Sequence, residues 1–587
     1  MLHDVAMAVA DWFLTLQERE NPHSRLAAPS AAPGWTTGNH VQALVHGRPY
    51  FEDLHQRIAQ MDAGDRIYFT DWRGDPDEQL TDDGQTLSAS LVAAAERGVD
   101  VRGLLWRSHW RYLGFHAEKH RQLGEDIDQA GGQCLRDMRV RTLGAHHQKF
   151  VILRHRDDST RDVAYVGGID ICHSRRDDAR HTGDPQALQI AAAFGPTPAW
   201  HDVQAALRGP VVHDVETTFR ERWEDSTPLT LNPGRTLSSF LQGEDQEPRP
   251  LGEQWPPPGP VSGGTAAVQV VRTYPAILPK GYDFAPDGER SIALANSKAV
   301  ARARRLIYVE DQYLWSTEVG KHFADALTAN PDLRMLIVLP MIPDVDAPVA
   351  KTTQFYGRRL AMEQILATGG DRVAVFGLCN AAGLPIYVHS KLCVIDDQWA
   401  SVGSDNLNRR SWTSDSEIAC LVVDERDSDS AAPDDSFPVL LLRELAAEHL
   451  GCIPEEIPTD LHDLFDAFVA SADALDSWYA AATDPTASAR RDPRHLARHL
   501  ARPRRKHGHR MDHARNTAAQ TAKAAVASSV DRGPRPPGQL RRFDLPHLSQ
   551  WQMRWAPKVY SVFDPDGTVL RDESLRELSR PGVGAQE

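Results

Sequence analysis

The chain has 587 residues, of which 41% are hydrophobic and 25% charged, and its formal net charge is −16. This length exceeds that of one ordinary domain, so we expect several structural units, each with its own core. The acidic balance argues against a protein whose main partner is nucleic acid, because such proteins usually carry a basic face.

The N-terminal segment, 1–40, predicts a short helix followed by a lead-in rich in Ala and Pro. It lacks the basic start of a signal peptide, and its apolar stretch is short and interrupted. No run of about 20 apolar residues occurs in the sequence, so no membrane-spanning helix is predicted. We therefore expect a cytoplasmic or peripheral membrane protein, unless a route without a signal peptide exports it.

The next segment, 41–225, predicts the first of two similar units. A strand is expected over 66–70, a helix over about 85–97, and an apolar strand over 101–106. Strands that alternate with helices are typical of a largely buried sheet covered by helices.

The segment 265–452 repeats this plan. A strand is expected over 306–309, a helical face over 319–327, and another strand over 333–339. The simplest account is an internal duplication, in which each unit is a mixed β-sheet flanked by helices.

The remaining segments differ in composition from these two units. Residues 226–264 are rich in Pro and Gly and predict a linker or surface loop. In the C-terminal extension, 453–587, the run 490–515 is strongly basic. This run is interpreted as a solvated segment, with contact to anionic lipid or to nucleic acid as alternatives. Further on, residues 559–563 and 568–570 flank a Pro-Asp-Gly turn and predict a hairpin.

A His-x-Lys pattern occurs once in each predicted unit, as His147–Lys149 and His389–Lys391, and a glycine turn follows each copy. Residues i and i+2 of a strand project to the same face, so each imidazole should lie beside its ammonium group. Two such pairs that converge on one cleft would suit a phosphodiester. The lysines would stabilise charge on the phosphate oxygens, one histidine would attack phosphorus, and the other would protonate the leaving oxygen. Because the lysines supply positive charge, no metal or other cofactor is expected there.

Residues 389–406 read His-x-Lys-x4-Asp-x6-Gly-Ser-x-Asn, which resembles the signature of the phospholipase D superfamily. The resemblance covers roughly 40–452 and is closest to the eukaryotic-type phospholipase D enzymes. The further matching segments are Trp200-His201-Asp202-Val203, Arg208-Gly209-Pro210, Ile307-Tyr308-Val309-Glu310-Asp311-Gln312-Tyr313, Asn408-Arg409-Arg410-Ser411, Ser416-Glu417-Ile418-Ala419 and Glu448-His449-Leu450-Gly451.

This resemblance implies a duplicated, two-lobed α/β fold whose two motifs meet at a pseudo-twofold interface. It also implies hydrolysis of the headgroup phosphodiester of glycerophospholipids to phosphatidic acid through a phosphohistidine, with transfer to alcohols as a side reaction. The alternatives are a phosphatidyltransferase similar to cardiolipin synthase, a nuclease of the same superfamily, and an inactive protein that binds lipid or protein. We expect the phospholipid at a membrane surface as partner, and a monomer.

The first motif departs from the family pattern at one position, where Arg154 replaces the Asp that the second motif has as Asp396. On a strand, this position has the opposite parity to the histidine and should not face the phosphate. Asp396 is therefore expected to be structural or to act through another residue. Asp157 or Asp158 is a candidate substitute for the missing carboxylate.

Each imidazole needs an acceptor for its second ring nitrogen. Asp170 and Glu417, which follow the two motifs, are the candidates, and Asn406 is a candidate for positioning phosphate or backbone. The residues 200–202 are left outside the catalytic set. The sequence does not decide which histidine is the nucleophile, and the resemblance favours His147.

Overall fold

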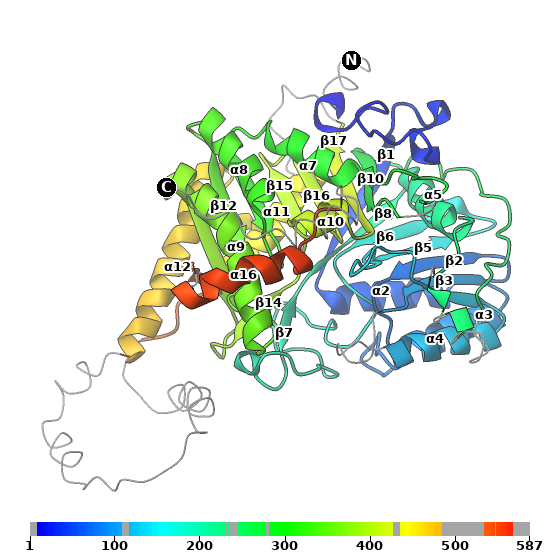
Figure 1. Cartoon of the computed structure of the whole chain (residues 1–587), viewed down its shortest axis with the longest axis horizontal. Coiled ribbons are helices and arrows are strands. Elements are labelled where there is room, and N and C mark those ends of the chain that lie inside the picture. Colours follow the sequence, from blue (N-terminus) through cyan, green and yellow to red (C-terminus); the bar gives the residue numbers. More distant parts are fainter. Residues whose placement is uncertain are drawn as a thin grey trace, which may run out of the picture.

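The computed structural model shows two lobes side by side, each built on one β-sheet (Figure 1). It describes residues 9–108, 117–230, 232–233, 236–237, 245–277, 281–425, 435–483, 533–545 and 547–567. The basic run 490–515 therefore lies outside the described residues. Within the described part of the chain, no helix is long and apolar enough to cross a bilayer.

The sheet of the first lobe has the strand order β4-β3-β2-β5-β6-β8-β1. Strands β2, β3 and β4 are parallel, and every other neighbouring pair is antiparallel. The strands are β1 (Thr36–Val45), β2 (Arg66–Asp71), β3 (Asp100–Trp106), β4 (Gln133–Asp137), β5 (Phe150–Arg154), β6 (Val163–Gly167) and β8 (Val203–Arg208).

The sheet of the second lobe repeats this order and these directions, as β13-β12-β11-β15-β16-β17-β9. β1 also pairs with β9, and this contact joins the two sheets. The predicted duplication is therefore visible in the strand topology itself. The strands are β9 (Ala266–Tyr274), β11 (Leu306–Glu310), β12 (Arg334–Val338), β13 (Val373–Cys379), β15 (Leu392–Ile395), β16 (Trp399–Gly403) and β17 (Glu417–Asp424).

Four shorter strands extend these sheets. Of these, β7 pairs in parallel with β14 and so links a first-lobe segment to the second sheet. β10 pairs with β9, and β18 from the C-terminal extension pairs with β13. Their bounds are β7 (Ala199–His201), β10 (Glu289–Arg290), β14 (Pro385–Val388) and β18 (Leu540–Arg542).

Helices cover both sheets. Their bounds are α2 (Gly47–Ala59), α3 (Leu87–Glu96), α4 (Ala117–Gln129), α5 (Val211–Trp223), α7 (Ser291–Val300), α8 (Thr317–Ala329), α9 (Pro348–Gly369), α10 (Arg409–Thr413), α11 (Phe437–Leu450), α12 (Leu461–Thr483) and α16 (Gln550–Phe563). Short 3-10 turns are η1 (Arg25–Ala27), η2 (Pro29–Ala31), η4 (Ser159–Arg161), η5 (Ala192–Phe194), η6 (Gly370–Arg372) and η7 (Pro454–Glu456).

The apolar strands are buried on both faces. In β11, Leu306 and Tyr308 face the core that both sheets share with α5 and α11, whereas Ile307 and Val309 face the outer core of the second lobe. Side chains of a strand alternate between faces, so a strand between two cores reads as a continuous apolar run. This explains why the sequence shows runs in place of strict alternation.

Two sequence-based expectations differ from the structure. β1 begins at Thr36, inside the segment expected to be a lead-in. The hairpin expected around 559–563 is wrong, because these residues end helix α16. Ser549 and Gln552 form a capping box at its start, and Tyr560 packs on Tyr356 of α9 with ring centroids 5.5 Å apart. Helices α16 and α9 lie side by side (Figure 1). The other predicted hairpin arm, 568–570, lies outside the described residues.

Candidate active site

Each His-x-Lys motif immediately precedes a strand of its own lobe and is bonded to a segment of the other lobe. The backbone N–H of His147 donates to Ser416 O at 2.9 Å, and that of His389 donates to His201 O at 2.8 Å. Ser416 and His201 immediately precede the acidic residues Glu417 and Asp202. These two backbone contacts therefore bring each motif next to a carboxylate of the other lobe.

Both imidazoles are held by these carboxylates across the lobe interface. His147 Nδ1 lies 3.0 Å from both carboxylate oxygens of Glu417. His389 Nδ1 lies 2.7 Å from Asp202 Oδ2. Both acids are fully buried, and the histidine side chains retain 15% and 6% exposure, respectively. An acceptor at Nδ1 fixes the tautomer and leaves Nε2 of each ring as the nitrogen that can act on a substrate.

The two lysines adopt matching positions. Lys149 Nζ donates to the carbonyl oxygen of His147 at 2.9 Å, and Lys391 Nζ donates to the carbonyl oxygen of His389. Lys391 also donates to Gln312 Oε1 at 3.2 Å. Burial lowers the pKa of Lys391 to about 8, although Asp202 opposes this shift. Each ammonium group is thus fixed beside its own histidine.

Asp170, which we expected to orient an imidazole, instead contacts two cations. Its Oδ1 lies 3.2 Å from Lys149 Nζ, and its Oδ2 lies 2.8 Å from Arg175 Nη2. Burial acts to raise the pKa of Asp170, but Lys149 and Arg175 together hold it well below its ordinary value. The carboxylate that contacts His389 is Asp202, which the sequence analysis left outside the catalytic set.

Asp202 could have been found from the internal duplication. It immediately precedes β8, and Glu417 is the first residue of β17, the strand that occupies the same place in the second sheet. Aligning the two halves strand by strand therefore places the two acids at equivalent positions. By the same alignment, Asp170 corresponds to Asn406.

Electrostatics and aromatic rings distinguish the two histidines. Burial lowers the pKa of His389 well below its ordinary value, and Lys391 and Arg175 lower it further. The centre of the Trp200 ring lies 5.0 Å from the centre of the His389 ring. The guanidinium of Arg175 also stacks on Trp200, 4.0 Å from the centre of the indole. His147 has Trp72 at 6.1 Å in an edge-on arrangement. Each imidazole is therefore bordered by one indole.

Two hydroxyl groups complete the surroundings of Glu417. Ser404 Oγ donates to Oε2 at 2.5 Å, and Ser411 Oγ donates to Oε1 at 2.8 Å. Asn406, two residues after Ser404, is buried, and its side-chain oxygen accepts no hydrogen bond from the described residues. This polar atom is available for a ligand or for water.

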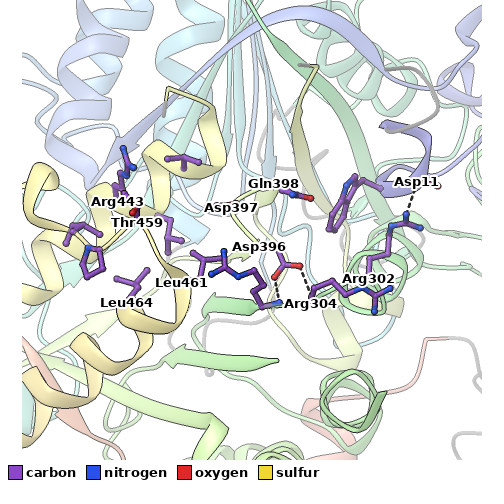
Figure 2. A pocket seen from close by; sticks show the side chains of 16 residues that line it. Asp11, Arg302, Arg304, Asp396, Asp397, Gln398, Arg443, Thr459, Leu461 and Leu464 are labelled. Carbon is purple, nitrogen blue, oxygen red and sulfur yellow. Dashed lines mark hydrogen bonds and ion pairs between the residues drawn. The ribbon is translucent and has the colours of Figure 1, made fainter. Parts of the chain in front are cut away.

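Asp396 lies at the opposite end of β15 from His389. Its carboxylate accepts hydrogen bonds from the backbone N–H groups of Arg304, Arg305 and Leu306 at 2.6, 2.7 and 2.8 Å. It also lines a surface cleft of about 610 Å³ together with Arg304 and Arg443 (Figure 2). Asp396 follows His389 by seven positions, and extended chain rises about 3.3 Å per residue, so the two residues lie about 20 Å apart. Asp396 thus ties β15 to the start of β11, away from the histidines.

Arg154, at the corresponding place in the first lobe, is buried in a different network. Its guanidinium contacts Asp162 at 2.8 Å and Glu216 at 2.5 Å. Neither Asp157 nor Asp158 replaces the missing carboxylate, since Asp157 is exposed and Asp158 caps a 3-10 turn. The first lobe makes an equivalent contact with the roles exchanged. Its carboxylate belongs to Asp65, just before β2, and Asp65 Oδ1 accepts from the backbone N–H of Arg156, just after β5, at 2.8 Å.

Both lobes match models of known protein families. The family model described as "Phospholipase D" matches residues 61–234, and that described as "Cardiolipin synthase, PLD-like domain" matches residues 298–433. The chain is 26% identical to phospholipase D gamma 2 of Arabidopsis thaliana over 521 residues, covering 64% of this chain and 58% of that protein. It is 26% identical to phospholipase D1 of Saccharomyces cerevisiae over 512 residues, covering 71% of this chain and 29% of that protein.

These alignments span less than two thirds of the length of either relative. Among solved structures, phosphatidylserine synthase of Haemophilus influenzae Rd KW20 aligns with a TM-score of 0.43 and 13% identity, covering 66% of this chain and 82% of that one. Both halves of the chain match models from one superfamily, and the duplicated sheets each carry one motif. The chain belongs to the phospholipase D superfamily.

Proposed function

We propose that the chain is a phospholipase D that hydrolyses the headgroup phosphodiester of glycerophospholipids and releases phosphatidic acid. The observation that carries this proposal is the crossed arrangement of the site, in which each motif histidine is held by a carboxylate of the other lobe. Both imidazoles, both carboxylate acceptors and both lysines that the reaction needs are present. The relatives named phospholipase D support the same reading.

In the first step, Nε2 of His147 attacks phosphorus, and the bond from phosphorus to the headgroup oxygen breaks. His389 donates its Nε2 proton to the departing oxygen, so the headgroup leaves as an alcohol and not as an alkoxide. Lys149 and Lys391 stabilise the charge that develops on the non-bridging oxygens. Burial lowers the pKa of His389 in the protein alone, and the negative phosphodiester acts in the opposite direction, because a nearby anion favours the protonated ring.

In the second step, neutral His389 takes a proton from water, and the resulting oxygen attacks phosphorus. The bond to His147 breaks, and phosphatidic acid is released. An alcohol that enters in place of water follows the same route and yields a phosphatidyl alcohol. Throughout, Glu417 and Asp202 accept hydrogen bonds from the Nδ1–H groups of the two rings and stabilise each ring when it is positively charged.

Helix α16 provides a surface suited to the membrane that holds this substrate. Trp551 is 70% exposed, and Met553, Val562 and Phe563 are about 40% exposed. Lys558 lies on the same helix and is exposed. Trp side chains favour the headgroup region of a bilayer, and cations favour anionic lipids. We attribute recruitment to α16 together with the basic run 490–515.

The decisive experiment incubates purified protein with vesicles of phosphatidylcholine and phosphatidylethanolamine plus 1-butanol and analyses the lipids by mass spectrometry. Phosphatidic acid together with phosphatidylbutanol is the expected result. Neither product from folded protein at several pH values would overturn the proposal. In a parallel assay with phosphatidylglycerol added to the vesicles as acceptor, cardiolipin as the main product would assign the chain to the phosphatidyltransferases instead.

A further inference from the structure

Three of the segments that match the family also contribute side chains to one buried cluster between the lobes, beside the contacts that two of them make to the motifs. His201 comes from the first of these segments, Glu310 from the second, and Glu448 from the third. Two further histidines, His46 and His181, join them. Buried polar side chains need partners, so a cluster of this size requires an explanation of its own.

The core of the cluster is three imidazoles around one carboxylate. His46 Nε2 lies 2.7 Å from Glu448 Oε2, and His181 Nε2 lies 2.9 Å from Glu448 Oε1. His201 Nδ1 lies 3.4 Å from the same Oε1. One ligand atom from each of the four residues lies within 4.8 Å of all the others. The three histidine side chains are at most 2% exposed.

The outer nitrogens of two of these rings face other carboxylates. His201 Nε2 lies 2.7 Å from Glu310 Oε2, and His181 Nδ1 lies 3.6 Å from Asp177 Oδ2. Histidines that bind metals usually donate their second N–H to a carboxylate or carbonyl, which aims the first nitrogen at the ion. His201 shows this pattern, whereas His181 Nδ1 faces Asp177 at a distance too long for a hydrogen bond.

One ring nitrogen points into the cluster without a hydrogen bond. His201 Nδ1 is completely buried, faces Glu448, and makes no hydrogen bond with the described residues. His46 and His181 are also held in left-handed backbone conformations, with φ of 72° and 51°. The fold thus accepts an uncommon backbone geometry in order to place these two rings.

We propose that His46, His181, His201 and Glu448 bind one divalent transition metal ion of the Zn²⁺ type. Three imidazoles and one carboxylate form a ligand set typical of zinc, whereas calcium and magnesium prefer oxygen ligands. The edges of a tetrahedral zinc site are about 3.3 Å, so the two shorter carboxylate–imidazole contacts, of 2.7 and 2.9 Å, would lengthen by about half an ångström. A dication would also offset the charges of Glu448 and Glu310 while the rings stay neutral.

The site would tie the lobes together behind the second motif. Three ligands belong to the first lobe, and Glu448 lies in the last turn of α11 in the second. Glu310, the partner of His201, also accepts from Ser390 Oγ at 2.6 Å, and Ser390 stands between His389 and Lys391. The metal would therefore help to position the second motif and would not contact the phosphate. This inference does not depend on the proposed lipid activity.

The test is the metal content of the full chain, purified without a polyhistidine tag, incubated with zinc sulfate and dialysed extensively. Inductively coupled plasma mass spectrometry should find about one zinc per chain. The His181→Ala and Glu448→Gln variants should retain less than about a fifth of that amount, because each loses one of four ligands. His213→Ala, which removes a partly exposed histidine outside the cluster, is the matched control and should bind like the parent chain.

A second readout guards against variants that fail to fold. The unaltered chain, loaded with Co²⁺ in place of Zn²⁺, should show the intense visible absorption of a four-coordinate site, and zinc should raise its melting temperature. Less than about a tenth of an equivalent of zinc in the unaltered chain overturns the proposal and leaves the cluster as a network of ion pairs. Full occupancy in folded His181→Ala protein overturns it equally, because the metal would then lie elsewhere.

Discussion

His389 and Asp202 come from different lobes, yet His389 Nδ1 lies 2.7 Å from Asp202 Oδ2. The contact is repeated with exchanged roles by His147 of the first lobe and Glu417 of the second, at 3.0 Å. Each lobe therefore supplies the imidazole of one half of the site and the carboxylate of the other half.

The first prediction concerns these carboxylates. Asp202→Asn should lower kcat by about 10²–10⁴ and change KM little, because the amide carries no negative charge and its NH2 group can donate to Nδ1 of His389, which favours the wrong tautomer. Glu417→Gln should act similarly on His147. Steady-state kinetics on mixed micelles measures both, with the exposed Asp157→Asn as matched control. An Asp202→Asn enzyme within about threefold of the parent would exclude an orienting role for this residue.

This pair also marks where prediction from sequence ended. The strands and the two motifs could be predicted because apolar runs and the His-x-Lys spacing are local signals. The acid that meets His389 depends on the parallel pairing of β7 with β14, which joins residues 187 positions apart. Asp170 is near its motif in sequence but is drawn to Lys149 and Arg175. Likewise, α16 is stabilised by its packing on α9, which the sequence does not reveal. The Pro-Asp-Gly turn that follows it suggested a hairpin, and the strand predicted over 559–563 was therefore wrong.

The second prediction identifies the nucleophile. In His389→Ala, a phosphatidyl ester of p-nitrophenol needs no general acid, so the first step should proceed and the second should stall. Intact mass spectrometry should then find the phosphatidyl group on the protein, and peptide mapping should place it on His147. With natural lipids, both histidine variants should lose several orders of magnitude in kcat. An adduct that forms on His389 in the reciprocal His147→Ala variant would reverse the assignment.

The third prediction concerns the lysines. Lys149→Ala and Lys391→Ala should each lower kcat by about 10²–10³, the usual effect of removing one preorganised charge donor. Lys149→Arg separates charge from geometry, because it keeps the positive charge but replaces the compact ammonium group, which donates to the carbonyl oxygen of His147, with a planar guanidinium. Melting temperatures close to that of the parent would show that the loss arises in the reaction. Near-normal rates in either alanine variant would contradict the paired-site mechanism.

The fourth prediction is a pH dependence of stability. Because burial lowers the pKa of His389, its ring is neutral in the folded protein at pH values where an unfolded histidine, with a pKa near 6.5, takes a proton. Above pH 6.5 both states are neutral at this ring, and the free energy of unfolding does not depend on its titration. Below pH 6.5 the unfolded state binds a proton that the folded state does not, so the free energy of unfolding falls by up to about 1.4 kcal/mol per pH unit. Urea unfolding between about pH 7.5 and 5.5 should therefore show a steeper decline for the parent chain than for His389→Asn. Parallel curves would contradict it.

The fifth prediction separates stability from activity at Arg154. Arg154→Ala leaves the buried carboxylates of Asp162 and Glu216 short of a partner and should destabilise the fold by about 3–5 kcal/mol. Arg154→Asp restores the family pattern in sequence but adds a third buried carboxylate, so it should be worse. Per folded molecule, Arg154→Ala should keep kcat within about threefold of the parent when assayed well below its melting temperature. A large loss of kcat at full folding would place this residue in the catalytic machinery.

The crossed contacts also limit how this protein can change over evolution. A chimera that takes its first lobe from one relative and its second from another receives each imidazole and its acceptor from different parents. Such an exchange preserves activity only where the acid of the foreign lobe lies within hydrogen-bond distance of the histidine across the lobe interface. The two halves, although they share one ancestor's topology, are therefore expected to diverge as a matched pair, in which the acid of one half and the histidine of the other move together.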